Sequence, residues 1–509
     1  MDGAIGFWRR RPGAAVAIAI ACLVALRIAV LAATPLELGP DEAQYWRWSR
    51  SLDWGYYSKP PLIAWGIAAA TSVFGDAEWG VRLLAPIAHG LAGFFLFSLG
   101  RRAFDPVVGA WSAALYLLMP GVWLSSAIMS TDAVLLPMWT ATLFCLWRLR
   151  ETPRLTEGLL LGLALGLAML AKYAALYLIG GAVLASLIDL QTRRALMSPG
   201  GLAALAVAAL VLSPNLAWNA ANDFATVSHT TDNANWNAAT FDLSHFGKFL
   251  TDQMAVFGPV SFLVLLAGCL LLVRRSRGET LTRELWLICF IAPPLIVIAF
   301  QAVISRAHAN WAATAYPAAC VLLASWIARA RWSRIIKAGV GLNAVVGVIF
   351  LVFAVAPSLG DAVGASNAFK RVRGWEETAA GLARIARENG ASAVMFDERE
   401  IWHGVDYYGR DLDLPPVRSW RRLAEARSHA EEAGTLLPGE DWLVLVASVR
   451  PDFRPLIRAD FASIEDRGVL AIPLGGGKVR ELRLYLASGY SPRLRTPEFE
   501  AEFAGKQED

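Results

Sequence analysis

Two adjacent carboxylates, Asp41 and Glu42, follow directly after a long apolar run that ends near Ala33. They open the stretch DEAQYWRW, in which aromatic side chains come at once after the acidic pair. A carboxylate placed there could accept a proton from a hydroxyl, bind a metal ion or stabilise the positive end of a helix dipole. These three interpretations stay open on the pair alone.

Three further ionisable residues stand at the ends of apolar runs. Lys59 lies in YYSKPPLIAW, Arg82 in EWGVRLLAP and Asp132 in MSTDAVLLPMW. A charged side chain in a membrane costs roughly 2.5–3.5 kcal/mol at a helix centre, so each is a functional candidate. Each also has a simple alternative, because cations snorkel to the interface and an Asp after Ser–Thr can cap a helix. Together they could deprotonate a hydroxyl and hold a phosphate-bearing partner.

The surrounding chain predicts a membrane domain followed by a water-soluble domain. Of 509 residues, 56% are hydrophobic and 18% are charged, against about 25% charged in ordinary soluble domains. The last 150 positions hold 46 of the 90 charged residues (21 Lys/Arg and 25 Asp/Glu). We therefore expect a polytopic domain over residues 1–358 and a soluble domain over 359–509. A net charge of +4 gives no reason to expect a nucleic-acid partner.

Apolar stretches of about 20 residues predict about eleven transmembrane helices, within two. They lie near residues 13–33, 80–100, 107–124, 131–148, 157–171, 173–190, 200–217, 254–273, 284–303, 309–328 and 335–356. The apolar stretch 60–74 is short and favours an interfacial helix. Arginine clusters fall in alternate loops, which predicts a cytoplasmic N-terminus and an extracytoplasmic C-terminal domain in a bacterial inner membrane.

The C-terminal segment has the pattern of a small α/β domain. GWEETAAGLARIARENG has helical periodicity and ends in Gly390, whereas SAVMF, DWLVLVAS and VLAIPLGGGKVRELRLYLAS are typical of strands. LGGGK lacks the spacing of a phosphate loop and is predicted to be a hairpin turn. The spacing of Gly158, Gly162 and Gly166 predicts close packing between two helices. The five cysteines lie in apolar runs without the spacing of a zinc site.

Four stretches of the chain together resemble the GT-C superfamily of polytopic glycosyltransferases. In chain order they are PDEAQYW, YYSKPPLIAW, GDAEWGVRLLAP and MSTDAVLLPMW. The branch that they resemble holds the protein O-mannosyltransferases and the lipid A aminoarabinose and galacturonic acid transferases. The resemblance is specific over residues 37–140 and looser to about residue 356. It implies a polyprenyl-phosphate sugar donor and an acceptor that is a glycolipid such as lipid A, another glycan or a protein.

Position by position, the resemblance implies that Asp41 is the general base, with Glu42 beside it. It implies that Lys59 contacts the donor phosphate and that Arg82 and Asp132 line the same cavity. The lipid A aminoarabinose transferases have a Glu directly before that Lys, a candidate metal ligand, where this chain has Ser58. A divalent metal is therefore doubtful here, and aminoarabinose becomes less favoured as the sugar.

Other residues on the same predicted face are candidates for substrate contacts: Tyr45, Tyr57, Arg306, His308 and Asn310. His229 and His245, in the long loop 218–253, are expected at the surface. The leading hypothesis is an inverting membrane glycosyltransferase that moves a sugar from a polyprenyl phosphate to an envelope acceptor. A transporter or flippase for lipid-linked sugars, with Asp41 and Asp132 as proton relays, is the alternative, and a sensing protein is a third.

Overall fold

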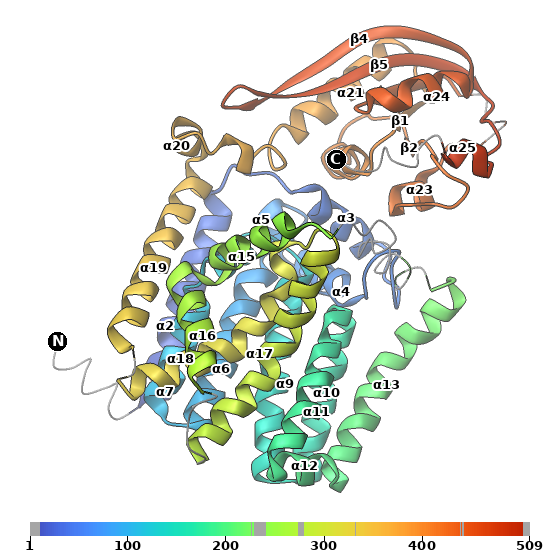
Figure 1. The fold of residues 1–509 in the computed structure, drawn as a ribbon. Coiled ribbons are helices and arrows are strands. Elements are labelled where there is room, and N and C mark those ends of the chain that lie inside the picture. Colours follow the sequence, from blue (N-terminus) through green and yellow to red (C-terminus); the bar gives the residue numbers. More distant parts are fainter. Residues whose placement is uncertain are drawn as a thin grey trace. The chain divides into compact units, whose positions relative to one another are not determined.

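The computed structural model describes residues 11–224, 226, 228, 241–272, 279–330, 332–437, 439 and 442–501. His229 lies outside the described residues. The chain forms two compact units: residues 1–33 with 52–352, and residues 34–51 with 353–509. The segment 34–79, predicted to be external, is thus divided, because residues 34–51 pack with the C-terminal part and residues 52–79 with the helices (Figure 1).

The first unit is helical. Its elements are α2 (Pro12–Ala33), α4 (Leu62–Phe74), α5 (Glu78–Arg82), α6 (Leu84–Ala103), α7 (Pro106–Leu117), α8 (Pro120–Ser125), α9 (Thr131–Glu151), α10 (Leu155–Ala171), η1 (Tyr173–Ala175), α11 (Leu176–Ile188), α12 (Leu190–Leu196), α13 (Pro199–Ala221), α15 (Leu243–Phe257), α16 (Pro259–Leu272), α17 (Glu279–Ile304), η3 (Ala309–Ala315), α18 (Tyr316–Ala328) and most of α19 (Ser333–Val355).

Six helical segments in the described part of the chain are long and apolar enough to cross a membrane. A seventh is obtained if α15 and α16, which meet at 112°, form one broken span. Helices do occupy the positions of all eleven predicted spans, but α7, α10 and α11 have only 12, 17 and 13 residues. The chain is a multi-pass membrane protein, and the number of eleven spans stays a prediction.

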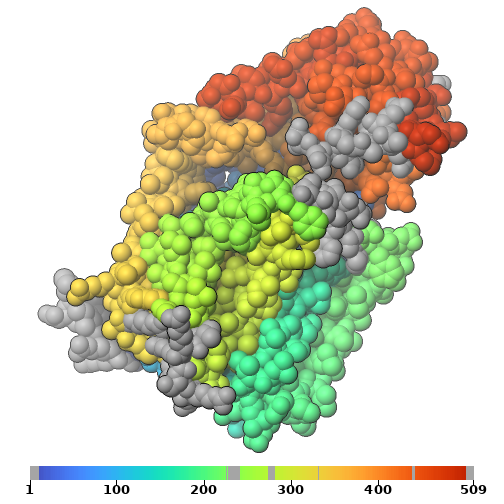
Figure 2. All heavy atoms as spheres, in the orientation of Figure 1, coloured from blue at the N-terminus to red at the C-terminus, as the bar shows by residue number. Residues whose placement is uncertain are grey.

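Close helix packing at the repeated glycines is confirmed. A Cβ atom added to Gly158 would lie 1.9 Å from the carbonyl oxygen of Gly200, and one added to Gly162 would lie 2.5 Å from that of Ala204. Only glycine allows the backbones of α10 and α13 to approach this closely. The helices α11 and α17 also lie side by side (Figure 2). A Cβ atom added to Gly181 would lie 2.4 Å from a ring carbon of Phe290.

The second unit is an α/β domain, as the sequence predicts. Its five-stranded sheet has the order β2-β1-β3-β5-β4; β1 is parallel to β2 and β3, and β5 is antiparallel to β3 and β4. LGGGK joins β4 and β5 in a hairpin turn. The elements are α3 (Pro40–Ser49), α20 (Pro357–Ala362), η4 (Ser366–Ala368), α21 (Trp375–Glu388), β1 (Ala393–Phe396), α22 (Arg399–Tyr408), β2 (Val417–Ser419), α23 (His429–Gly434), β3 (Val444–Ser448), η5 (Pro451–Phe453), α24 (Arg454–Ala459), β4 (Phe461–Gly475), β5 (Lys478–Tyr490) and α25 (Pro497–Ala501).

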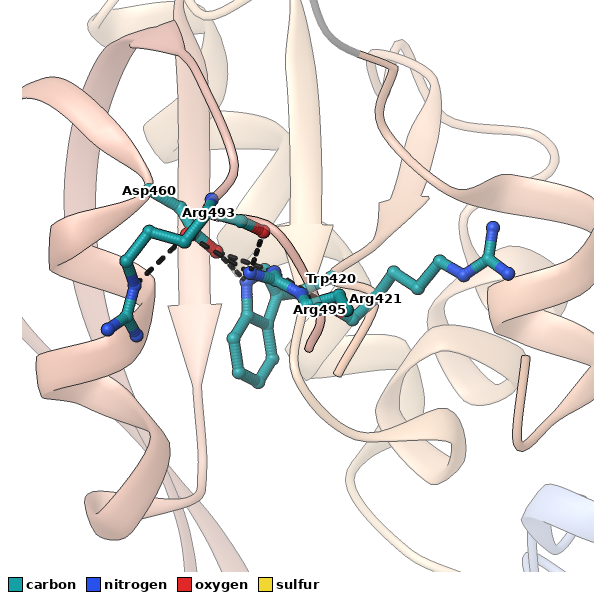
Figure 3. Close-up of polar contacts among 5 residues, drawn as sticks. All are labelled: Trp420, Arg421, Asp460, Arg493 and Arg495. Atoms are coloured by element: carbon teal, nitrogen blue, oxygen red, sulfur yellow. Dashed lines mark hydrogen bonds and ion pairs between the residues drawn. The ribbon is translucent and has the colours of Figure 1, made fainter. Parts of the chain in front are cut away.

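A fully buried carboxylate ties the end of this domain together. Asp460, at the end of α24, accepts hydrogen bonds from Trp420 Nε1 at 2.8 Å and from Arg495 Nη2 at 2.7 Å. It also accepts one from the backbone N–H of Arg493 at 2.9 Å. Arg495 reaches further to the carbonyl oxygen of Arg421, whose side chain points away from the cluster (Figure 3). The segment after β5 is thereby fixed to the end of β2.

Candidate active site

The two carboxylates of the acidic pair have different environments. Glu42 is 4% exposed, and its Oε2 accepts a hydrogen bond from the backbone N–H of Gly39 at 2.9 Å. This contact satisfies a backbone donor at the start of α3, as in a capping box. Asp41 is one residue earlier on the helix and its side chain is 52% exposed. Asp41 is therefore the carboxylate of the pair that solvent can reach.

Arg399, the first residue of α22, holds the exposed carboxylate. Its Nη1 lies 3.2 Å from Asp41 Oδ1 and donates to Gln44 Oε1 at 3.0 Å. Burial lowers the pKa of Arg399, but the nearby carboxylates, of which Asp41 has the largest effect, outweigh burial and raise it. The guanidinium thus stays charged beside the carboxylate, and it restricts the orientation of Asp41.

Further contacts dock α3 and the segment before it onto the C-terminal domain. The Trp46 ring meets Tyr407 edge to face at 4.9 Å, and the Tyr408 hydroxyl accepts from the Leu38 N–H at 2.6 Å. Glu37 accepts from the backbone N–H of Trp375 at 2.6 Å, at the N-terminus of α21, where the helix dipole favours an anion. The predicted contact residue Tyr45 is buried, with its ring 5.4 Å from Trp48.

In the first unit, Lys59 lies in a tight turn directly before α4. Its backbone N–H and C=O pair with the C=O and N–H of Tyr56 at 3.3 and 3.1 Å. The turn is anchored to α13, because Asn215 Nδ2 donates to the Trp54 carbonyl at 2.7 Å. Ser58 is buried, whereas Lys59 and Tyr57 are half-buried. The backbone of this element is therefore fixed before any substrate binds.

Arg82 is the last residue of α5 and is only 2% exposed. It lies inside a helical segment, residues 78–103, that is apolar enough to cross a membrane. Holding a guanidinium there costs several kcal/mol unless other groups compensate, so a purely incidental role is disfavoured.

Asp132 joins three segments of the first unit. It lies in the first turn of α9, but the side chain that caps this helix is Ser130, which accepts from the Ala133 N–H at 3.3 Å. The Asp132 carboxylate instead accepts from Lys172 Nζ at 2.8 Å and from Asn310 Nδ2 at 2.6 Å. Lys172 separates α10 from η1, and Asn310 lies in η3.

Positive charge gathers around this carboxylate. His308 and Arg306 are exposed, and the His308 ring contacts Trp311 at 5.0 Å. Partial burial first, and then the charges of Arg306 and Lys172, lower the pKa of His308. An end of the first unit that bears the cations Lys172 and Arg306 is suited to an anionic substrate group.

The structure thus brings Asp132 together with the predicted Asn310, and with Lys172, which the sequence did not single out. Arg399 is a second residue that was missed, because it stands in a charge-rich tail where an arginine has no special signal. The lone Lys172 between two apolar runs was a signal that could have been used. Among the described residues, no group of three or more His, Cys, Asp or Glu side chains could hold a metal ion.

Comparison with known proteins agrees with these features. The profile of the dolichyl-phosphate-mannose-protein mannosyltransferase family matches residues 58–218. The chain is 35% identical over 391 residues to the lipid A galacturonosyltransferase RgtD of Rhizobium johnstonii, which covers 76% of this chain and 80% of that protein. It is 31% identical over 193 residues to the undecaprenyl phosphate-alpha-4-amino-4-deoxy-L-arabinose arabinosyl transferase of Pseudomonas aeruginosa, which covers 34% and 35% of the two chains.

The fold is also that of a solved membrane enzyme. The structure superposes on ArnT from Cupriavidus metallidurans bound to undecaprenyl phosphate with a TM-score of 0.61, at 17% identity, covering 96% of this chain and 100% of that one. The relative that is 35% identical over 76% of this chain identifies the family, and the shared fold agrees with it. The chain is a membrane glycosyltransferase and belongs to the GT-C superfamily, in the branch of the lipid A sugar transferases and the protein O-mannosyltransferases.

Proposed function

We propose that this enzyme transfers galacturonic acid from a polyprenyl phosphate to lipid A at the outer face of a bacterial inner membrane. The observation that carries the proposal is the 35% identity to a lipid A galacturonosyltransferase over 76% of the chain. The likeness to the aminoarabinosyl transferase covers only 34% of the chain, and Ser58 replaces the Glu of those enzymes. Both observations favour the uronic acid over the amino sugar.

Two observations support a polyprenyl-phosphate donor. The aminoarabinosyl transferase is named for undecaprenyl phosphate, and the ArnT structure with the same fold contains that lipid. In the proposed topology, the N-terminus is cytoplasmic and the C-terminal domain is periplasmic, as the alternate arginine clusters predict.

The proposed reaction is a single displacement at the anomeric carbon. A hydroxyl oxygen of lipid A forms the new bond to that carbon, while the bond from the carbon to the phosphate oxygen breaks. The hydroxyl proton passes to a carboxylate, and the electron pair of the broken bond leaves with the phosphate. One displacement inverts the configuration of the anomeric carbon.

Asp41 is the carboxylate that we assign as the general base. Its exposed side chain supports this assignment, since a base must reach the proton that it removes. Glu42 is already used as the cap of α3, and this favours a supporting structural role for it.

Lys59 and Arg82 are assigned to the donor phosphate, whose charge grows as the bond breaks. Cations fixed in a site of low dielectric stabilise such a charge without reorganising during the reaction. A galacturonosyl donor brings a second negative charge, its own carboxylate. The cations Lys172 and Arg306 would supply the charge for it, with Asp132 positioning Lys172 and Asn310, while His308, whose pKa is lowered, would contribute as a neutral hydrogen-bonding ring.

The test uses the purified full-length protein, lipid A and two donors, the polyprenyl phosphates of galacturonic acid and of aminoarabinose. Mass spectrometry of the lipid should show one added hexuronic acid residue with the first donor only. Transfer from the aminoarabinose donor alone would reject the sugar assignment. No transfer from either donor, to lipid A or to a whole envelope lipid extract, would reject the function.

Two variants test the residue roles in the same assay. Asp41→Asn should lower the rate by roughly 10²–10⁴-fold, which is the usual contribution of a general base. Lys59→Ala should raise the KM for the donor far more than the KM for lipid A. Full activity of Asp41→Asn would remove the assigned base, and equal effects of Lys59→Ala on both substrates would remove the phosphate role.

A further inference from the structure

A cavity of about 440 Å³ in the first unit is lined by four arginines. It lies between the ends of α6 and α9, the short helix α12 and the start of α17. The lining residues that could bind a ligand are Arg102, Trp147, Arg150, Glu151, Arg194 and Arg283. The proposed transfer chemistry uses none of these residues.

The cavity is well separated from the candidate active site. Asp132 lies in the first turn of α9, whereas Arg150 and Glu151 are the last two residues of this 21-residue helix. An α-helix rises 1.5 Å per residue, so the two ends of α9 are about 30 Å apart. The cavity therefore belongs to the opposite end of the membrane unit, the end that the arginine distribution predicts to be cytoplasmic.

Carboxylates and aromatic rings fix two of the arginines in place. Arg150 donates to Asp189 from Nε at 2.6 Å and from Nη2 at 3.2 Å, and its guanidinium lies 4.6 Å from the Trp147 ring centre. Arg102 forms an ion pair with Glu151, which also accepts from Trp147 Nε1 at 3.0 Å. Fixed guanidinium groups lose little conformational entropy when they bind a planar or tetrahedral oxyanion.

The net formal charge of the side chains around the cavity is positive. Four arginines and one lining carboxylate give a formal charge of +3, and Asp189 behind Arg150 reduces it to +2. Arg283 is oriented by its hydrogen bond from Nη1 to the Ala103 carbonyl at 2.5 Å, and Arg194 is exposed. The positive-inside tendency explains arginines on this side but not their arrangement around one hollow.

We propose that this cavity binds a phosphate group. Guanidinium groups bind phosphate through paired, charge-assisted hydrogen bonds, which matches this lining. The volume falls in the range of small-molecule sites, about 300–1,000 Å³, and exceeds what inorganic phosphate alone would fill. Basic pockets between transmembrane helices on the cytoplasmic side commonly take anionic lipid headgroups, which makes a phospholipid the favoured source of the phosphate.

The experiment compares the full-length protein with two variants of adjacent arginines on α12. Arg194 lines the cavity, whereas its exposed neighbour Arg193 does not, so Arg194→Gln and Arg193→Gln make the same change of charge one residue apart. Native mass spectrometry would count phosphatidylglycerol and phosphatidylcholine bound to each protein. In parallel, thermal midpoints in detergent would be measured with and without inorganic phosphate.

Wild type and Arg193→Gln should retain phosphatidylglycerol in preference to phosphatidylcholine, and Arg194→Gln should bind it roughly fivefold more weakly. If inorganic phosphate stabilises wild type but not Arg194→Gln, free phosphate is a ligand of the cavity. If wild type retains phosphatidylglycerol but is not stabilised by inorganic phosphate, the ligand is the lipid headgroup. Equal losses in both variants, or no loss in Arg194→Gln, would overturn the proposal. Transfer of sugar is measured separately, so failure of the proposed function would not be mistaken for failure of this site.

Discussion

Arg399 Nη1 lies 3.2 Å from Asp41 Oδ1 and so links the exposed carboxylate of α3 to the first turn of α22. The same nitrogen donates to Gln44 at 3.0 Å, three residues further along α3. A single guanidinium therefore contacts two side chains on one face of that helix. The orientation of the proposed base depends on the C-terminal part of the chain, for which the sequence suggested no catalytic contribution.

Loss of this guanidinium should slow the reaction without unfolding the protein. Because the pair is largely exposed, with 40% and 52% of the two side chains accessible, Arg399→Ala should cost less than about 1 kcal/mol of stability. We expect kcat to fall about tenfold, since small errors in the position of a catalytic group are costly. Arg399→Lys should recover part of the rate. The measurements are kcat, KM, the pH–rate profile and the thermal midpoint.

Arg371→Ala is the matched control, because Arg371 forms an exposed ion pair with a different carboxylate, Glu400 of the same helix. It should leave kcat and the pH–rate profile unchanged. If Arg399→Ala had the activity and pH–rate profile of this control, Arg399 would not position Asp41.

Glu42 should tolerate a neutral replacement that Asp41 does not. Its carboxylate caps α3 through the Gly39 N–H, and the amide oxygen of Gln can accept the same hydrogen bond. Glu42→Gln should therefore keep activity within a few-fold of wild type. Glu42→Ala should cost about 1 kcal/mol of stability through loss of the cap. Rates and thermal midpoints of the two variants would be compared; loss of activity in Glu42→Gln at unchanged stability would assign a chemical role to Glu42.

The sequence predicted local features of the site well and partnerships poorly. An acidic pair at a helix start, the short apolar helix after Pro61 and the hairpin of the C-terminal domain all depend on neighbouring residues, which local patterns reveal. The Arg399–Asp41 pair joins residues 358 positions apart, and Lys172–Asp132 joins residues 40 apart. Such pairs form only when the chain folds, so local sequence patterns do not predict them.

The number of membrane spans likewise depends on tertiary packing that local sequence patterns do not predict. Hydropathy marks apolar helices, but it does not separate a helix that crosses the bilayer from a shorter one packed inside the protein. α10 shows why: it has only 17 residues, Gly158 and Gly162 on one side meet the backbone of α13, and Leu159, Leu160 and Leu163 elsewhere on the helix are exposed.

Asp132 and Lys172 should be coupled in stability. Both side chains are mostly buried, 9% and 23% exposed, so removing one partner leaves a charge in an apolar environment. Asp132→Asn or Lys172→Met alone should destabilise the protein by about 3–5 kcal/mol, whereas the double variant should recover much of that loss. A double-mutant cycle on the thermal unfolding of the detergent-solubilised protein measures this coupling. Additive losses would show that the pair contributes no coupling.

Asp460 should be a purely structural carboxylate. It is fully buried and is shared by Trp420, Arg495 and the backbone of Arg493. Asp460→Ala should lower stability by about 3–5 kcal/mol because Arg495 then loses its buried partner. The exposed Asp466, which pairs with Arg483 in the hairpin, provides the control Asp466→Ala, which should change stability little because exposed ion pairs contribute little. Similar thermal midpoints for the two variants would contradict the structural assignment.

Two histidines beneath α3 should make the C-terminal domain less stable in acid. The rings of His403 and His429 stack with centres 5.5 Å apart, and Trp48 of α3 meets His429 edge to face. Burial is the main cause that lowers both pKa values, that of His429 to about 4 and that of His403 well below its usual range. The positive charge of Arg47 lowers both further, and Arg399 also acts on His403.

The sign follows from proton uptake. In the unfolded chain these histidines bind protons near pH 6.5, whereas in the fold the pKa of His429 is about 4 and that of His403 is also well below its usual range. The unfolded state therefore binds more protons as the pH falls, and stability that is complete above about pH 6.5 is lost toward pH 4. Thermal midpoints across this range should fall more steeply for wild type than for a His403→Gln/His429→Gln variant. His245→Gln, in the first unit, should keep the wild-type slope, and an unchanged slope in the double variant would exclude the stacked pair as the cause.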